Sequence, residues 1–337
     1  MNRREFLISS TAAVAAAGTR TVWAQPPAGA KQSTLDRISI MTLNFQRILK
    51  VPDVQDSPDR TLELFDIAEM VADKYGVHKV EFQHYHIPST EPSYLKELRG
   101  RIEKSKSRMT QINLEFGALN MSAPQQRDRL MAIDLTKMWV DHAAMLGAQR
   151  VMINQGGPAG QPTHENKHYG IPTLKAMADY GRSKGIIVSV ETRGGGGGNR
   201  GAGRGTAPGT TTGATMTTTT TAPAAAAPTP APTGPPPLTG LAAWTLLAEI
   251  LKGAGAYSNV DVGGAGAANQ EELHACLKTM FPMTAGSMHT RVNMNWDLAT
   301  AIRFLEGELG YKGLYTIEAS NSHEGTREIY DVVVATL

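Results

Sequence analysis

Short apolar runs alternate along this chain with longer segments in which apolar residues recur every three or four positions. The runs have the composition of buried strands, and the longer segments have the spacing of one apolar helix face. The strand-like runs lie at residues 38–45, 79–87, 111–119, 150–156, 186–192, 257–264, 286–293 and 313–320. A helical segment follows each run, and no hairpin turn joins one run directly to the next. The pattern therefore predicts eight successive strand–helix units.

The helical segments support the same division of the chain. They lie at 61–75, in the Leu-rich stretch after residue 87, at 127–146, 174–183, 241–255, 269–281 and 297–310, and from about 326 onward. Gly147, Gly185, Gly255 and Gly310 each end a helical segment just before a strand, as a C-terminal helix cap does. Repeated strand–helix units of this number favour a single-domain (β/α)8 TIM barrel, an α/β fold, over residues 37–337. An open dinucleotide-binding sheet is disfavoured because the first strand lacks a Gly-x-Gly-x-x-Gly turn.

One segment interrupts the pattern between the fifth strand and its helix. Residues 194–240 consist almost entirely of Gly, Ala, Thr and Pro and show no hydrophobic periodicity. A segment of this composition buries too little apolar surface to offset the entropy of ordering it, so we expect disorder. Because closure entropy grows slowly with loop length, a barrel tolerates a long insertion in one βα loop.

The N-terminus predicts export. Paired arginines, Arg3 and Arg4, precede an Ala-rich apolar run, and small residues before Gln25 suit cleavage after Ala24. This arrangement resembles a bacterial twin-arginine signal peptide over residues 1–24, followed by a linker over 25–36. The apolar run is too short for a stable membrane span. We therefore expect the twin-arginine export machinery as a partner and a periplasmic or secreted protein.

Charge and cysteine content narrow the classes of partner. The net charge of the 337 residues is +2, and the first 24 residues carry three arginines against Glu5, which is also +2. Subtracting one from the other leaves a neutral mature chain, which offers no electrostatic surface for nucleic acid. The single cysteine, Cys276, excludes an intrachain disulfide and falls within an apolar helix pattern.

Four consecutive predicted strands each carry an ionisable residue near the carboxyl end, which is the active-site face of a TIM barrel. These residues are Glu191, Asp261, His289 and Glu318. A bare charge in an apolar strand is costly unless it is paired or bound to a cation. Three carboxylates and one imidazole suit one divalent metal ion, Mn²⁺, Mg²⁺ or Co²⁺, better than a thiolate-binding metal. The sequence therefore predicts a metal centre at the barrel mouth.

Other polar residues are candidates for binding substrate. Glu81 and His84 lie in the second predicted strand and could reach the pocket, or could serve only as loop and surface residues. Arg291 shares a strand face with His289, because side chains two residues apart point the same way. Arg291 could bind a substrate carboxylate or phosphate, or could simply neutralise a neighbouring glutamate.

The order Glu, Asp, His, Glu on strands five to eight resembles the xylose isomerase-like TIM-barrel superfamily, the sugar phosphate isomerase/epimerase group. The resemblance covers the mature chain except for the insertion. It implies that Glu191, Asp261, His289 and Glu318 bind one divalent metal ion, and that the two glutamates exchange protons at the carbon being inverted. A metal that polarises a carbonyl stabilises an enediolate, and two carboxylates permit proton removal on one face and return on the other.

The chain also departs from the ketose 3-epimerases of that group. Gly264 stands where those enzymes carry a histidine three residues after the metal-binding Asp, and Asn295 stands where they carry a substrate-binding arginine. The identity of the sugar is therefore open. The missing histidine at 264, Arg291 and the neutral mature chain also argue against apurinic-site endonucleases, which use a three-metal cluster on the same barrel.

The function most consistent with these features is an exported, divalent-metal-dependent sugar isomerase or epimerase that transfers protons next to a carbonyl through an enediolate. Its substrate is expected to be a small, unphosphorylated carbohydrate, because phosphorylated intermediates stay in the cytoplasm. Two alternatives stay open: a 3-keto-glycoside lyase or hydrolase on the same barrel, and a non-catalytic periplasmic sugar-binding protein. The oligomeric state is not determined by the sequence.

Overall fold

A computed structural model describes residues 30–52, 54–55, 57–116, 119–155, 162–192, 238–319 and 321–337. Parallel strands form a closed barrel in chain order, and the last strand pairs with the first. The strands are β1 (Ile38–Met41), β2 (Lys79–Gln83), β3 (Arg108–Leu114), β4 (Arg150–Ile153), β5 (Ile187–Glu191), β6 (Tyr257–Asp261), β7 (Thr284–Thr290) and β8 (Leu314–Ile317). The predicted (β/α)8 barrel is therefore confirmed.

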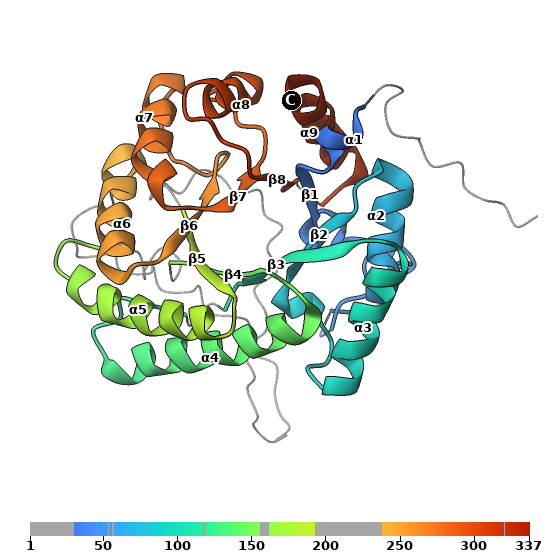
Figure 1. Ribbon diagram of the computed structural model, residues 1–337, viewed down its shortest axis with the longest axis horizontal. Coiled ribbons are helices and arrows are strands. Elements are labelled where there is room, and N and C mark those ends of the chain that lie inside the picture. The colour runs from blue at the N-terminus through green and yellow to red at the C-terminus, as the bar shows by residue number, and fades with distance from the viewer. Residues whose placement is uncertain are drawn as a thin grey trace, which may run out of the picture.

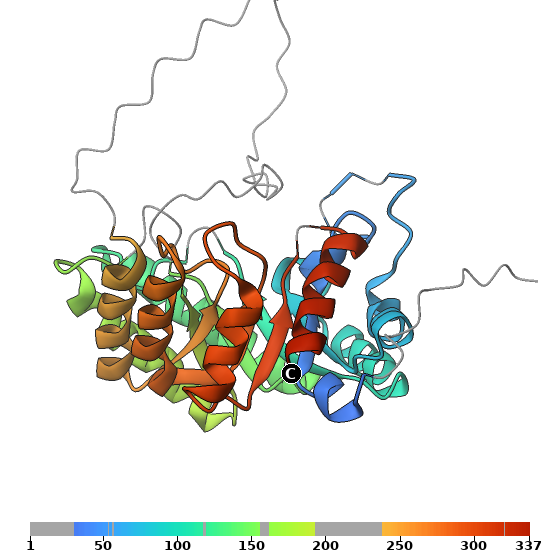
Figure 2. The ribbon, with the colours of Figure 1, turned by 90° about the horizontal axis from the view of Figure 1, so that it is seen from above.

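Helices surround the strands as an outer layer (Figure 1), and α6 to α9 run side by side along one flank (Figure 2). The helices are α1 (Gln32–Leu35), α2 (Ile67–Tyr75), α3 (Pro92–Lys104), α4 (Gln126–Leu146), α5 (Lys167–Ser183), α6 (Gly240–Ala254), α7 (Gln270–Met280), α8 (Leu298–Gly307) and α9 (His323–Thr336). Gly147 and Gly255 end α4 and α6 in the left-handed conformation, with φ of 73° and 60°, as their positions predicted. Among the described residues, no helix is both long enough and apolar enough to cross a membrane.

Several element boundaries differ from the predicted ones. The first predicted strand ends at Met41 and continues as a 3₁₀ turn, η1 (Thr42–Phe45), and the second ends at Gln83 and continues as η3 (His84–His86). Hydrophobic composition does not distinguish an apolar strand from an apolar turn, so both strands were predicted too long. Helix α5 begins at Lys167 and runs through Pro172, a residue that normally interrupts a helix.

Three predicted segments fall largely outside the described residues. These are the signal peptide at 1–24, the first part of the 25–36 linker, and the insertion at 194–240 up to residue 237. The described part of the linker contains the short helix α1, and the last residue assigned to the insertion, Gly240, is the first residue of α6.

Alternation along the strands gives the barrel an apolar outer face and a polar interior. Val190, Val260 and Ile317 are buried. Each is followed by an ionisable residue, and two of these ionisable residues are the last of their strands. Since successive side chains point to opposite sides of a strand, the ionisable groups face the barrel axis. The interior extends across the barrel as a polar layer, because Gln111 of β3 donates to Asn259 of β6, a non-neighbouring strand, at 3.4 Å.

A partly buried ion pair secures the opposite end of the barrel, where the chain enters β1. Both terminal nitrogens of Arg37 bond the two carboxylate oxygens of Glu306 on α8, at 2.8 and 2.7 Å. The Tyr315 hydroxyl of β8 donates to the same carboxylate at 2.8 Å. This bidentate contact joins the first strand, the last strand and a covering helix, and such geometry is the stronger form of ion pair.

We expect Glu306→Ala to lower the free energy of unfolding by about 2 kcal/mol, because it removes the shared partner of Arg37 and Tyr315 while both groups stay partly buried. The matched control is Lys312→Ala, which removes only an exposed contact to Glu306 and should change stability by less than about 0.5 kcal/mol. Urea denaturation monitored by circular dichroism measures both values. Equal stability of the two variants would contradict this role of Glu306.

Candidate metal centre

The residues expected to bind metal lie on adjacent strands at one end of the barrel. Glu191 is the last residue of β5 and Asp261 the last of β6, while His289 lies in β7 and Glu318 directly follows β8. Asp261 is in register with His289 on the neighbouring strand. None of the four is more than 4% exposed. Because the strands are parallel, their carboxyl ends bring these side chains to one buried site.

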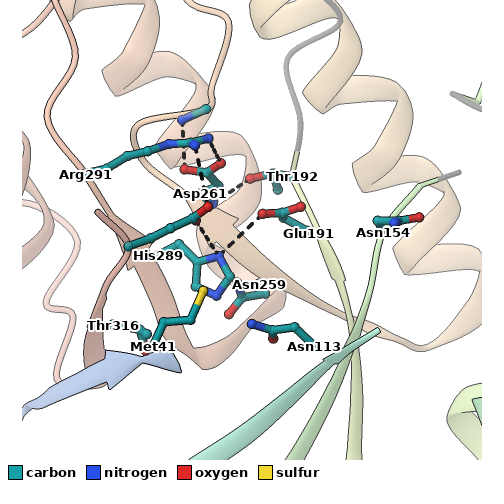
Figure 3. A network of polar contacts seen from close by, with 12 residues as sticks. Met41, Asn113, Asn154, Glu191, Thr192, Asn259, Asp261, His289, Arg291 and Thr316 are labelled. Atoms are coloured by element: carbon teal, nitrogen blue, oxygen red, sulfur yellow. Dashed lines mark hydrogen bonds and ion pairs between the residues drawn. The ribbon is translucent and has the colours of Figure 1, made fainter. Parts of the chain in front are cut away.

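Three of these residues converge closely enough to share an ion. One ligand atom from each of Glu191, His289 and Glu318 lies within 4.8 Å of the others. His289 Nδ1 is 3.4 Å from Glu191 Oε1 and 3.2 Å from Glu318 Oε2, and Figure 3 shows the Glu191 carboxylate pointing toward the imidazole ring. Within the described structure, this buried Nδ1 makes no hydrogen bond. A buried nitrogen between two carboxylates fits a cation that all three side chains could bind.

Asp261 lies beside this cluster and has a different set of partners. Its Oδ2 forms an ion pair with Arg291 Nη2, and its Oδ1 accepts a hydrogen bond of 2.8 Å from the backbone of Gly264. In Figure 3 the Arg291 guanidinium lies against the Asp261 carboxylate. Arg291 Nη1 also lies 3.6 Å from Glu318 Oε1. The structure therefore brings Asp261 to the mouth of the barrel but places it against Arg291.

Two glycines after β6 make room for this arginine. A Cβ atom on Gly263 would overlap the aliphatic part of Arg291, and one on Gly264 would overlap both the Asp261 carboxylate and the guanidinium. Gly264 is also the position where the sequence resemblance expects a histidine. The Arg291 side chain fills the space that these two glycines leave open.

The site contains more carboxylates than cationic side chains. Burial opposes protonation of His289, but the Glu81 charge and the close carboxylates of Glu191 and Glu318 outweigh it and raise the His289 pKa well above its usual value. Burial also opposes ionisation of Glu318, but Arg291 and His289 lower its pKa to about 2. Glu318 is therefore ionised at neutral pH, and the site attracts positive charge.

Glu81 lies in β2 and contacts His289 inside the barrel. It is fully buried, its Oε1 is 2.6 Å from His289 Nε2, and Asn113 Nδ2 donates to the same oxygen at 2.7 Å. The expected contact between Glu81 and substrate stays a prediction, and the contacts observed for this side chain are with His289 and Asn113. Sequence spacing placed Glu81 on the inner face of β2 but gave no information about its depth.

His84 is packed into the wall of the barrel rather than into the cluster. Its ring packs at a tilt against Phe116 and edge-on against Trp139, with centroid distances of 4.0 and 5.5 Å. Its Nδ1 accepts a hydrogen bond of 3.1 Å from the Glu115 backbone. Burial lowers the His84 pKa to about 4, so the ring is neutral at physiological pH. Of its described contacts, none joins it to Glu191, and a role of His84 in binding substrate remains a proposal.

The donor set suits a hard divalent cation. Two carboxylates and an imidazole nitrogen are the ligands that Mn²⁺, Mg²⁺ and Co²⁺ accept, and the cluster contains no thiolate. The other ring nitrogen of His289, Nε2, donates a hydrogen bond to the Glu81 carboxylate. A histidine that binds metal usually has such a partner on its second nitrogen. The buried Glu191–His289–Glu318 group could therefore bind a metal ion.

Comparison with known proteins agrees with this architecture. The family model described as xylose isomerase-like TIM barrel matches residues 70–212. A search of curated proteins found no sequence match. Among solved structures, the xylose isomerase domain protein from Planctomyces limnophilus is 12% identical, with a TM-score of 0.58, over 89% of this chain and 96% of that chain.

Two further structures belong to sugar epimerases. The D-psicose 3-epimerase from Clostridium cellulolyticum H10, solved with D-tagatose, is 10% identical, with a TM-score of 0.57, over 89% of this chain and 95% of that chain. The 3-keto-D-glucoside 4-epimerase from E. coli is also 10% identical, with a TM-score of 0.55, over 89% of this chain and 98% of that chain. Together with the family match, these similarities confirm the expected resemblance: the chain has the fold of the xylose isomerase-like TIM barrels.

Proposed function

We propose that this protein is a divalent-metal-dependent sugar isomerase or epimerase that acts after export. The observation that carries the proposal is the convergence of Glu191, His289 and Glu318 in one buried site at the carboxyl end of the barrel. The barrel is shared with sugar epimerases and with a xylose isomerase domain protein. Export is inferred from residues 1–24 and is part of the proposal.

The two glutamates are the proposed acid and base. Glu191 and Glu318 come from β5 and β8, two strands separated by β6 and β7, so their carboxylates approach the site from different directions. A substrate carbon held between them can lose a proton to one carboxylate and regain a proton on its other face. A metal bound in the site would polarise the neighbouring carbonyl and stabilise the negative charge that develops on its oxygen.

Arg291 is the proposed substrate-orienting residue. Its side chain is 23% exposed at the mouth, and its guanidinium lies close to Asp261 and Glu318. A guanidinium held by two carboxylates is fixed in direction and can donate to a sugar hydroxyl or carbonyl oxygen. In this proposal the main role of Asp261 is to hold the Arg291 guanidinium in place.

Charge counting favours an uncharged substrate. At the mouth, the three carboxylates of Glu191, Asp261 and Glu318 face one guanidinium, Arg291, which leaves two negative charges. One divalent cation neutralises them, so no positive charge remains in excess to attract a phosphate or carboxylate group. This count supports a free sugar or a keto-sugar over a sugar phosphate.

Elimination from a 3-keto-glycoside is the second candidate. The same fold is found in a 3-keto-D-glucoside 4-epimerase and in a probable 3-DHS dehydratase from Bacillus anthracis, at 10% identity each. A carboxylate that removes a proton beside a keto group can invert that carbon or expel a leaving group from the next one. The products formed from ketoses and from 3-keto-glycosides distinguish the two reactions.

We expect His289→Ala to weaken Mn²⁺ binding at least about 100-fold, because the central nitrogen of the cluster is lost. In the wild type, Mn²⁺ at a hundredfold excess over Kd should add about 2.7 kcal/mol to the free energy of unfolding. Isothermal titration calorimetry measures affinity, and thermal melting measures stabilisation. The matched control is His84→Ala, which removes a buried histidine outside the cluster and should alter the Kd less than about threefold. Unchanged affinity in His289→Ala would refute the site.

We expect Glu318→Gln to reduce deuterium incorporation from solvent into the substrate by about 100-fold or more, because an amide cannot accept the proton. Mn²⁺ affinity should fall by only about tenfold, since the amide keeps one ligand oxygen. Mass spectrometry of ketoses incubated in D₂O measures the exchange. Glu115→Gln, a carboxamide change outside the cluster, is the control and should retain exchange within about threefold. Undiminished exchange in Glu318→Gln would assign the base to another residue.

A further inference from the structure

We infer that Glu81 is a positioning residue: it fixes the ring of His289 so that Nδ1, rather than Nε2, faces Glu191 and Glu318. The inference rests on the proposed metal site and adds a residue that acts through His289 without touching metal or substrate. It also replaces the substrate-binding role expected for Glu81.

The contact between the two side chains crosses the barrel. Glu81 lies on β2 and His289 on β7, two strands that are not neighbours, and Glu81 Oε1 is 2.6 Å from His289 Nε2. Neither side chain is more than 1% exposed, so water does not compete for the bond. An ionised carboxylate only accepts hydrogen bonds, so Nε2 must carry the proton of this bond. The lone pair available to a cation is then on Nδ1, the nitrogen that faces the two glutamates.

Glu81 is held in turn by a chain of amides. Asn113 Nδ2 donates to Glu81 Oε1 at 2.7 Å, and Gln111 Nε2 donates to Asn113 Oδ1 at 2.9 Å. The bond from Gln111 turns the Asn113 carbonyl away from Glu81 and directs its NH₂ group toward the carboxylate. A further contact of 3.4 Å joins Gln111 to Asn259. The chain links β6, β3 and β2, so the orientation of Glu81 is set by the interior of the barrel.

A purely structural role would explain this geometry less well. Burying a carboxylate is expensive, and an apolar side chain of similar size would fill the same space without that cost. Glu81 Oε2 is buried and has no hydrogen-bond partner among the described residues, so the carboxylate is only partly satisfied by the protein. The carboxylate determines which nitrogen of His289 carries the proton, and an apolar residue could not do so.

The test compares Glu81→Leu, Glu81→Gln and the wild type, with Mn²⁺ titrated by calorimetry. We expect Glu81→Leu to weaken Mn²⁺ binding about 10- to 100-fold, the range typical of residues that orient a ligand, and Glu81→Gln to recover most of that loss through its carbonyl oxygen. Glu115→Gln is the matched control and should bind Mn²⁺ like the wild type. Equal affinity in all four proteins would overturn the positioning role.

The second readout is the His289 ring proton, followed by ¹H–¹⁵N NMR with and without Mg²⁺. The wild type should show a downfield, exchange-protected proton on Nε2, which moves upfield in Glu81→Gln and disappears in Glu81→Leu. If Glu81→Leu does not fold, the Glu81→Gln spectrum decides: an unchanged Nε2 proton would refute the inference. Failure of the proposed metal site gives a different result from failure of the positioning role. If the metal site is wrong, the wild type itself binds no Mn²⁺, although its Nε2 proton is still present.

Discussion

The burial of negative charge inside a closed barrel is the constraint on which this site depends. The carboxylates concerned come from four strands and are at most 4% exposed: Glu81, Glu191, Asp261 and Glu318. Water cannot stabilise them at this depth, so each requires a cation or a strong donor. Two cationic side chains meet that need. His289 lies among three of the carboxylates, and Arg291 pairs with Asp261 beside Glu318.

These two cations have different tasks. Arg291 keeps its charge under all physiological conditions and is held by Asp261 in the space left by Gly263 and Gly264. His289 can lose a proton, and its Nδ1 lies at the point where two glutamates converge. A divalent ion could replace that proton, whereas the Arg291 guanidinium keeps its own charge. The proposed metal site and the proposed substrate-orienting site therefore adjoin each other and share Glu318, whose carboxylate also lies 3.6 Å from Arg291.

Much of this arrangement was predictable from the chain. The alternation of apolar strands with helical segments predicted the barrel, and Gly147 and Gly255 marked helix ends that the structure confirms. The same alternation placed Glu191 and Asp261 on the inner face at the carboxyl ends of their strands. Boundaries were less predictable where an apolar turn continued a strand, as after Met41, because turn and strand residues there are equally hydrophobic.

The sequence by itself determined which residues face the barrel axis, since a period of two along each strand follows from local backbone geometry alone. It did not determine how deep each residue lies or which residue it meets across the barrel. Glu81 and His289 are far apart in the chain and on strands that do not pair, and only closure of the barrel brings them to 2.6 Å. Likewise, the choice of Arg291 as the partner of Asp261 depends on space left by two glycines. Contacts of this kind arise from packing in three dimensions, which no local pattern of residues encodes.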